Sequence, residues 1–302
     1  MKSFPCPSFL ASELGETDPA DALFHVIPVP YEKSVSYGKG TGGGPDAILR
    51  ASQQLELYDG FSIPAERGIY TCRAVDCEGP PEEVLPRIGG LVREAVHQKR
   101  IPVVLGGEHT VTAGALQGLE RLSGRIGVVQ FDAHADLREE YEGTIHSHAC
   151  AMRRALEMGF SLFQLGVRSL SFEEEVFRRD LGIGRLDAAD IFRKGIPERI
   201  FPEDFPPNIY LTIDVDVFDP SLMPSTGTPE PGGLLWYQMM QILERVIARR
   251  NMVGFDVVEL APIPGFHAPD FTVARLLYNL MGMIVRKREG REHSAESREQ
   301  RA

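Results

Sequence analysis

The segment RIGVVQFDAHAD, residues 125–136, decides the fold class. It begins as an apolar run typical of a buried strand and ends in ionisable residues at alternate positions, namely Asp132, His134 and Asp136. Side chains at alternate positions of an extended segment point to the same side. Bringing such groups together is strongly unfavourable unless a counter-charge holds them. The segment therefore predicts a buried strand whose end carries a functional site.

Apolar runs of this kind alternate with helical patterns along most of the chain. The strand candidates are residues 22–30, 68–76, 101–107, 125–133, 161–167, 208–218 and 252–260, and the clearest helix candidates are 81–99, 110–122, 147–158, 235–250 and 270–287. Continuous apolar strands with intervening helices indicate a mostly parallel sheet covered on both faces. We therefore expect a three-layer α/β/α architecture, with one domain over residues 1–287 and a disordered tail over 288–302.

Composition narrows the classes of partner. The chain has 302 residues and a formal net charge of −11, which argues against nucleic acid because phosphate binding needs a basic face. The first residues lack the apolar core of a signal peptide, and no run reaches membrane-spanning length, so we expect a cytoplasmic protein with no membrane partner. The four cysteines form no C-x-x-C pair, which indicates reduced thiols. Cys150 lies close to His148, so a thiol nucleophile stays open as an alternative.

The glycine-rich segment GKGTGGGPDAILRAS, residues 38–52, has two interpretations. A phosphate-binding loop would need the order G-x-x-x-x-G-K-[ST], and Lys39 instead precedes most of the glycines. Pro45 suits the first turn of a helix, and Asp46 is favourable near a helix N-terminus. The segment therefore predicts a helix start.

Two further strand ends also carry ionisable residues. VVLGGEHT supplies Glu108 and His109, and LTIDVDVFDP supplies Asp214, Asp216 and Asp219. Sites in open α/β sheets form outside the carboxyl ends of the strands. Two divalent cations would offset the charge of four aspartates at these ends, and mixed oxygen and nitrogen ligands favour Mn²⁺, with Co²⁺ or Ni²⁺ as alternatives. Solvated acids at each strand end are the other interpretation.

Four ordered motifs resemble one family. GGEHT (106–110), DAHAD (132–136), DVDVFDPSLMPSTGTPEPGG (214–233) and GFDVVELAP (254–262) together resemble the ureohydrolase (arginase/agmatinase) superfamily, and its agmatinase branch most closely. The resemblance implies an arginase-like fold and a centre of two Mn²⁺ per subunit that hydrolyses a guanidino group to urea and an amine. It also implies a homo-oligomer, either a trimer or a hexamer.

The resemblance implies a ligand set. One ion would take His109 and Asp136, the other would take His134 and Asp216, and Asp132 and Asp214 would bridge the two ions. A non-catalytic regulatory homologue, which is one alternative, would be expected to lose ligands, and all six positions keep ligand residue types. A metallophosphoesterase, the second alternative, would need G-D-x-x-[DN] and G-N-H-[DE] motifs, which the sequence lacks.

The resemblance also implies residues that act on the substrate. Glu259 matches a glutamate that pairs with the guanidinium, since carboxylate and guanidinium form bidentate, charge-assisted bonds. His148 matches a catalytic histidine that carries a proton or orients the substrate, and with Glu259 and Asp136 it completes the predicted catalytic set. His146 competes with His148 for this role. Glu230 either faces the site mouth, where it would bind substrate, or caps a turn.

The segment LREEYEGTIHS, residues 137–147, bears on the substrate. True arginases carry an Asn/Ser/Thr-rich stretch there, which is missing here. Its glutamates, Glu139, Glu140 and Glu142, would attract a distal ammonium, although Arg138 is a contrary charge and a solvated acidic loop is the alternative. We therefore expect a small cationic guanidino substrate. The prediction is agmatine, giving putrescine and urea, with N1-aminopropylagmatine next and guanidinobutyrate or arginine fitting worse.

Overall fold

The computed structural model describes residues 7–120, 122 and 124–290 and contains one parallel sheet. Its strands, in the spatial order β2-β1-β3-β8-β7-β4-β5-β6, are β1 (Phe24–Val29), β2 (Ile69–Thr71), β3 (Ile101–Gly106), β4 (Ile126–Phe131), β5 (Ser161–Leu165), β6 (Gly184–Leu186), β7 (Asn208–Asp214) and β8 (Asn251–Val258). Every neighbouring pair is parallel. Parallel strands need crossover connections, and helices supply most of them.

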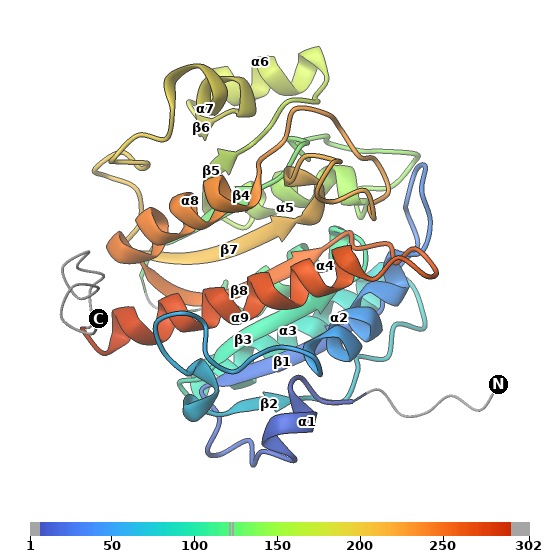
Figure 1. Cartoon of the computed structure of the whole chain (residues 1–302). Coiled ribbons are helices and arrows are strands. Elements are labelled where there is room, and N and C mark those ends of the chain that lie inside the picture. The colour runs from blue at the N-terminus through green and yellow to red at the C-terminus, as the bar shows by residue number, and fades with distance from the viewer. Residues whose placement is uncertain (1–6, 121, 123, 291–302) are drawn as a thin grey trace.

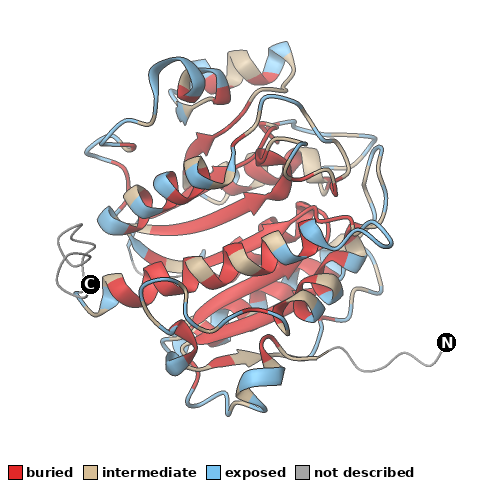
Figure 2. Ribbon diagram, viewed as in Figure 1, coloured by how far each residue is buried: buried red, intermediate tan, exposed pale blue. Residues whose placement is uncertain are grey.

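Helices cover both faces of this sheet (Figure 1). One layer contains α2 (Gly44–Ser52), α8 (Trp236–Arg249) and α9 (Ala268–Arg288), whose apolar residues share a core with Val103 and Leu105 of β3. The other contains α3 (Pro81–His97), α4 (Thr110–Gln117) and α5 (Ala151–Glu157), which pack with Val104 from the same strand. Alternate strand residues thus pack into two separate hydrophobic cores, one on each face of the sheet. The strands are buried throughout their central part (Figure 2). The predicted three-layer α/β/α fold is confirmed.

The predicted elements agree with the structure except at some ends and in short segments. The sequence-based prediction did not include α1 (Ala11–Leu14), α6 (Phe172–Asp180), α7 (Ala188–Lys194) or β6, which are short and less buried. The strand predicted over 208–218 ends at Asp214, and a 3₁₀ turn, Val215–Val217, follows. The turn forms because the Asp214 side chain accepts a hydrogen bond from the Asp216 N–H at 2.9 Å. Because Asp216 lies in this turn, Asp214 and Asp216 are not spaced as alternate residues of one extended strand.

The glycine-rich segment 38–52 is a helix start, as predicted. Pro45 lies in the first turn of α2, and the preceding loop is closed by Glu32, whose carboxylate accepts hydrogen bonds from the N–H groups of Gly40 and Gly42, each at 2.9 Å. A carboxylate of the chain itself therefore occupies the backbone donors that a phosphate would need.

The last helix, α9, continues through Arg288, while residues 291–302, most of the predicted disordered tail, lie outside the described residues. Among the described residues, no helix is both long enough and apolar enough to cross a bilayer.

Candidate metal centre and active site

Four adjacent strands deliver the predicted site residues to one edge of the sheet. The order β3-β8-β7-β4 brings together the carboxyl ends that carry His109, Glu259, Asp214 and Asp132. His109 immediately precedes α4, and Glu259 directly follows β8. The strand order therefore makes neighbours of residues that are up to 150 positions apart in the chain, such as His109 and Glu259.

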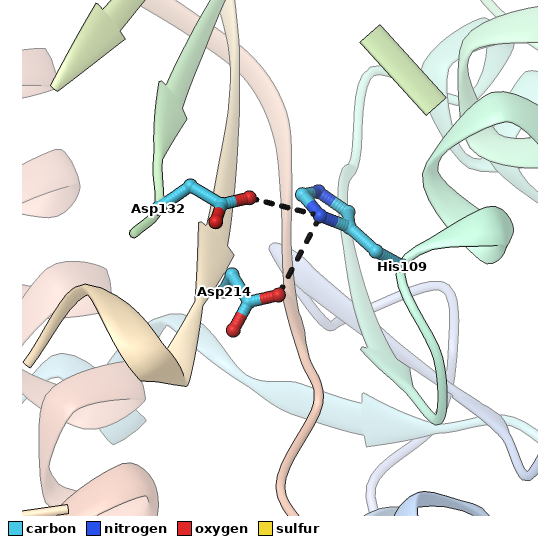
Figure 3. Close-up of side chains that lie close together, drawn as sticks. All are labelled: His109, Asp132 and Asp214. Atoms are coloured by element: carbon cyan, nitrogen blue, oxygen red, sulfur yellow. Dashed lines mark ion pairs between the residues drawn. The ribbon is translucent and has the colours of Figure 1, made fainter. Parts of the chain in front are cut away.

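Three carboxylates surround one nitrogen of His109. Its Nδ1 atom lies 2.7 Å from Asp136 Oδ2, 3.1 Å from Asp132 Oδ2 and 3.6 Å from Asp214 Oδ2. Figure 3 shows His109 facing Asp132 and Asp214 from across the site. His109 and Asp132 are almost fully buried, yet Nδ1 has no contact with the geometry of a hydrogen bond. The atoms therefore converge on a common point without bonding to one another.

A second group lies beside the first and shares one residue with it. His134 Nδ1 lies 2.9 Å from Asp216 Oδ2 and 3.6 Å from Asp132 Oδ1. His109, Asp132 and Asp214 form one set of ligand atoms within 4.8 Å of one another, and Asp132, His134 and Asp216 form the other. Asp132 belongs to both sets, as a bridging ligand would. Asp214 belongs only to the first set, and its bridging role stays a prediction.

The tautomer of His109 shows that these groups fit a cation. Its Nε2 lies 2.9 Å from the Thr212 hydroxyl, which donates its own proton to Asp256 Oδ1 at 2.6 Å. Thr212 must therefore accept the Nε2–H, which leaves Nδ1 of the neutral ring as a lone pair. A lone pair directed at carboxylate oxygens is repulsive unless a proton or a metal ion lies between them. Without a metal, burial lowers the pKa of His109, but Asp132 and Asp136 outweigh burial and raise it well above its ordinary value. Metal ligation by Nδ1 supplies positive charge in place of a proton.

The titration of the carboxyl groups shows the same need for positive charge. Burial, with the charge of Asp132 adding to it, raises the pKa of Asp136 to about 7. Burial and the charges of Asp216 and Asp132 raise the pKa of Asp214 well above its ordinary value. Burial lowers the pKa of His134, but hydrogen bonds with Asp132 and Asp216 outweigh it and raise the pKa to about 12. Without cations the cluster would collect protons, and divalent cations that accept oxygen and nitrogen ligands would fit in their place.

Replacing Thr212 by valine tests this arrangement. Valine keeps the shape but removes the acceptor for His109 Nε2–H, so the lone pair is no longer held at Nδ1. Partners that orient ligating histidines are worth roughly 10- to 100-fold in metal affinity, and we expect a loss of that size. Titration of metal-free protein with Mn²⁺ by calorimetry measures it. An unchanged affinity would show that Thr212 does not orient His109.

Two site residues have a backbone conformation that is uncommon without glycine. Asp136 has φ of 52° and Glu259 has φ of 65°, both in the left-handed region. The turn at Asp136 is held on each side: its carbonyl accepts the N–H of Met152, and the next N–H, from Leu137, is donated to Glu174 Oε1 at 3.0 Å. Such strain is common at functional sites, where surrounding contacts maintain it.

Glu259 is held by one carboxylate oxygen and offers the other. Its Oε1 accepts the backbone N–H of His109 at 2.6 Å, and Oε2 makes no hydrogen bond with any described residue. Burial raises the pKa of Glu259 well above its ordinary value, so the ionised form needs a cationic partner. A buried carboxylate with a free oxygen can therefore receive a guanidinium.

The two competing histidines lie in different places. His148 lines the pocket of the cluster, where its ring makes an edge contact with Tyr141. His146 does not line this pocket but faces another groove, and its Nε2 lies 3.4 Å from Glu82. The position of His148 favours it for a role in proton transfer.

The pocket above the cluster has a volume of about 340 Å³. From the segment 137–147, Arg138 and Tyr141 line it, whereas the three glutamates are exposed and do not. An acid that does line it is Glu174, which the sequence analysis missed. Glu174 belongs to the S-x-x-E capping box of α6, so a sequence signal existed, but it indicated only a helix start.

Three other candidates lie outside the cluster. Glu230 does not line the pocket. Its Oε1 accepts a hydrogen bond at 3.0 Å from Ser169, which does line the pocket. Asp219 accepts hydrogen bonds from Ser221 and Gly232 and so closes its own loop. Burial raises the pKa of the Cys150 thiol to about 11, which leaves little thiolate to act as a nucleophile.

Known proteins resemble this chain over nearly its whole length. A model of the arginase family matches residues 22–282. The N(1)-aminopropylagmatine ureohydrolase of Synechocystis sp. is 39% identical over 91% of this chain and 92% of its own length. The agmatinase of Pyrococcus horikoshii is 34% identical over 91% of this chain and 96% of its own length.

Solved structures agree in fold. The agmatine ureohydrolase of Thermoplasma volcanium superimposes with a TM-score of 0.84 at 28% identity, covering 94% of this chain and 96% of its own. The arginase of Bacillus cereus gives a TM-score of 0.75 at 23% identity, covering 86% and 98%, which shows the fold alone.

Proposed function

This chain belongs to the arginase family and to its agmatinase branch, and we propose that it hydrolyses the guanidino group of a cationic guanidinoalkylamine to urea and an amine. The observation that carries the proposal is the convergence of two ligand sets that share Asp132, with Glu259 beside them. The sets would hold two divalent cations, for which Mn²⁺ is our first candidate and Co²⁺ or Ni²⁺ the alternatives.

The contacts support most of the ligand roles that the resemblance implies, and the bridging role of Asp214 rests on the resemblance. His109 and Asp136 would hold one ion, His134 and Asp216 the other, and Asp132 with Asp214 would bridge them. When bound, paired divalent cations lower the pKa of water from about 15.7 to about 7 and so supply a nucleophile at neutral pH. The strained turns at Asp136 and Glu259 hold two side chains in place, one a proposed metal ligand and the other the proposed partner of the guanidinium.

Glu259 and His148 act on the substrate. Glu259 would bind the guanidinium through charge-assisted hydrogen bonds, which orients the central carbon toward the cluster. Cleavage of the carbon–nitrogen bond releases an amine, which must gain a proton as it leaves. His148 lines the pocket and would carry a proton to that nitrogen.

An acid in the rest of the pocket supports a substrate without a carboxylate. Glu174 is a buried acid in the wall. Its carboxylate oxygens accept the backbone N–H groups of Leu137 and Ser171, and no ion pair joins it to a cation among the described residues. It would favour a distal ammonium, whereas Arg138 lies at the exposed rim over the ring of Tyr141. Four curated relatives at 34–39% identity are named for N1-aminopropylagmatine, which makes it the first substrate to test beside agmatine, our prediction from the sequence.

Urea release tests the proposal. The full chain is loaded with Mn²⁺ and given N1-aminopropylagmatine, agmatine, 4-guanidinobutyrate and arginine side by side. Agmatine and 4-guanidinobutyrate form a matched pair, because they differ mainly in the charge of the distal end. We expect the two cationic compounds to give the higher kcat/KM. Preference for a carboxylate compound would overturn the substrate assignment, and urea from none of them would overturn the proposed reaction.

The two histidines can be compared directly. We expect His148→Ala to lower kcat by roughly 10²-fold or more, the usual range for loss of a general acid or base. His146→Ala is the matched control and should stay close to wild type, because His146 lies in another groove. Steady-state kinetics with the best substrate measures both. A larger loss in the His146 variant would reassign the proton carrier.

The oligomer also remains open to test. We propose a trimer or hexamer, as the resemblance to the family implies. Light scattering on the purified chain measures the mass directly, and a monomer would contradict this proposal.

A further inference from the structure

Glu108 is a buried carboxylate beside the cluster with no role so far. It is fully buried, and its oxygens accept hydrogen bonds from the backbone N–H groups of Lys33 and Ser34 and from the hydroxyls of Ser34 and Thr110. Two of these four partners are backbone N–H groups, which can only donate, and an ionised Glu108 accepts hydrogen bonds from all four. These four contacts therefore fix the position of Glu108.

Ser34 connects this carboxylate to His148. Its hydroxyl donates its single proton to Glu108 Oε1 at 2.7 Å, so its oxygen can only accept from other groups. Two nitrogens of His148 approach that oxygen, the backbone N–H at 3.2 Å and the ring Nδ1 at 3.3 Å. A ring nitrogen in contact with an oxygen that can only accept must itself carry a proton. The contact therefore indicates a proton on Nδ1.

The backbone holds this chain of contacts in place. The loop that carries Ser34 follows β1 and is tied to the end of β3, since Gly107 N–H is donated to Val29 O and Glu108 N–H to Tyr31 O, each at 2.9 Å. A Cβ at Gly107 would lie 2.0 Å from Tyr31 O, so glycine alone permits this approach. Ser34 thus has little freedom to leave its place between Glu108 and His148.

We propose that Glu108 and Ser34 are positioning residues that hold His148 in the tautomer with its proton on Nδ1. The lone pair of Nε2, which makes no hydrogen bond with any described residue, is then free to take a proton and return it to the leaving amine. When Nε2 holds that proton, the ring is cationic and the Glu108 carboxylate offsets its charge through the Ser34 hydroxyl. The consequence for catalysis rests on the proposed function of His148, but the tautomer does not.

Ser147 is the competing partner and supplies the matched control. Its hydroxyl also lies 3.3 Å from His148 Nδ1. If Ser147 donated to Nδ1, the ring would carry its proton on Nε2, and the Ser34 oxygen would face an unprotonated Nδ1 at 3.3 Å, which is repulsive. Ser34→Ala and Ser147→Ala each remove one hydroxyl from the same nitrogen, so they separate the two arrangements.

Nuclear magnetic resonance of ¹⁵N-labelled histidine measures the tautomer. The full chain is loaded with diamagnetic Zn²⁺, and the signals of His148 are assigned by their loss in His148→Ala. We expect a proton on Nδ1 in wild type, in Ser147→Ala and in Ser34→Thr, and a shift toward the Nε2–H form in Ser34→Ala. The proposal is overturned if wild type carries the proton on Nε2, or if Ser147→Ala rather than Ser34→Ala changes the tautomer.

Kinetics of the same variants separate this inference from the proposed function. With Mn²⁺ bound, Ser34→Ala should lower kcat by roughly 10²-fold, the lower end of the range for proton transfer catalysis, without raising KM, and Ser34→Thr should restore most of it. A changed tautomer with unchanged kcat would uphold the positioning by Ser34 and refute the proton role of His148. An unchanged tautomer in Ser34→Ala would refute the inference, whatever the kinetics.

Discussion

Replacing Glu259 by glutamine is expected to remove most turnover while leaving the metal content unchanged. Glutamine keeps the size and can still accept the His109 N–H, but it cannot pair its charge with a guanidinium. Losing one charge of a buried, hydrogen-bonded pair costs about 2–5 kcal/mol. At about 1.4 kcal/mol per factor of ten, kcat/KM should fall by about 30- to 4,000-fold.

The measurement combines kinetics with metal analysis on the same preparation. Glu230→Gln is the matched control, because Glu230 accepts a hydrogen bond from Ser169 but does not itself line the pocket. It should change kcat/KM little, which would also remove Glu230 from the predicted substrate-binding residues. Retained turnover in Glu259→Gln would refute its role, and loss of metal would show that it supports the cluster instead.

Replacing Asp132 by alanine is expected to have the largest effect of any single change. Asp132 is fully buried and is the residue common to both ligand sets, so its loss affects both ions. Residues that only orient ligands are worth roughly 10- to 100-fold in affinity, and a shared ligand should exceed that range. We expect neither ion to be retained through dialysis and urea release to fall to background. Asp214→Ala should behave alike if Asp214 also bridges.

Controls separate metal loss from unfolding. Asp190→Ala removes an exposed aspartate that pairs with Lys194 and should leave metal binding and activity unchanged. Circular dichroism checks that Asp132→Ala is folded. A folded Asp132→Ala protein that keeps two ions and normal turnover would contradict the arrangement drawn here.

The sequence predicted most of the fold and the cluster because both depend on local patterns. The apolar strands and the ionisable residues at their ends are visible in the segments around Asp132 and Asp214, and the parallel sheet then brings those ends together. Thr212 could also have been found, since it precedes Asp214 by two positions on a strand and so shares its face. Its meaning required the hydrogen bond to His109.

The site residues that were not predicted depend on contacts between segments far apart in the chain. Ser34 lies 114 residues from His148, and no pattern in either segment indicates that they meet. Glu174 has a clear local signal as a helix-capping residue, which concealed its place in the pocket wall. The glutamates of segment 137–147 were predicted to face the substrate but are exposed outside the pocket, because charge in a loop does not determine which side chains line it.

The two-metal centre is tested most directly by the number of metal ions that urea release requires. Metal-free protein is titrated with Mn²⁺, and bound metal and urea release from N1-aminopropylagmatine or agmatine are measured at each step. We expect no urea release without metal and full activity at two ions per chain. Full activity at one ion per chain, or urea release from metal-free protein, would contradict the two-metal centre.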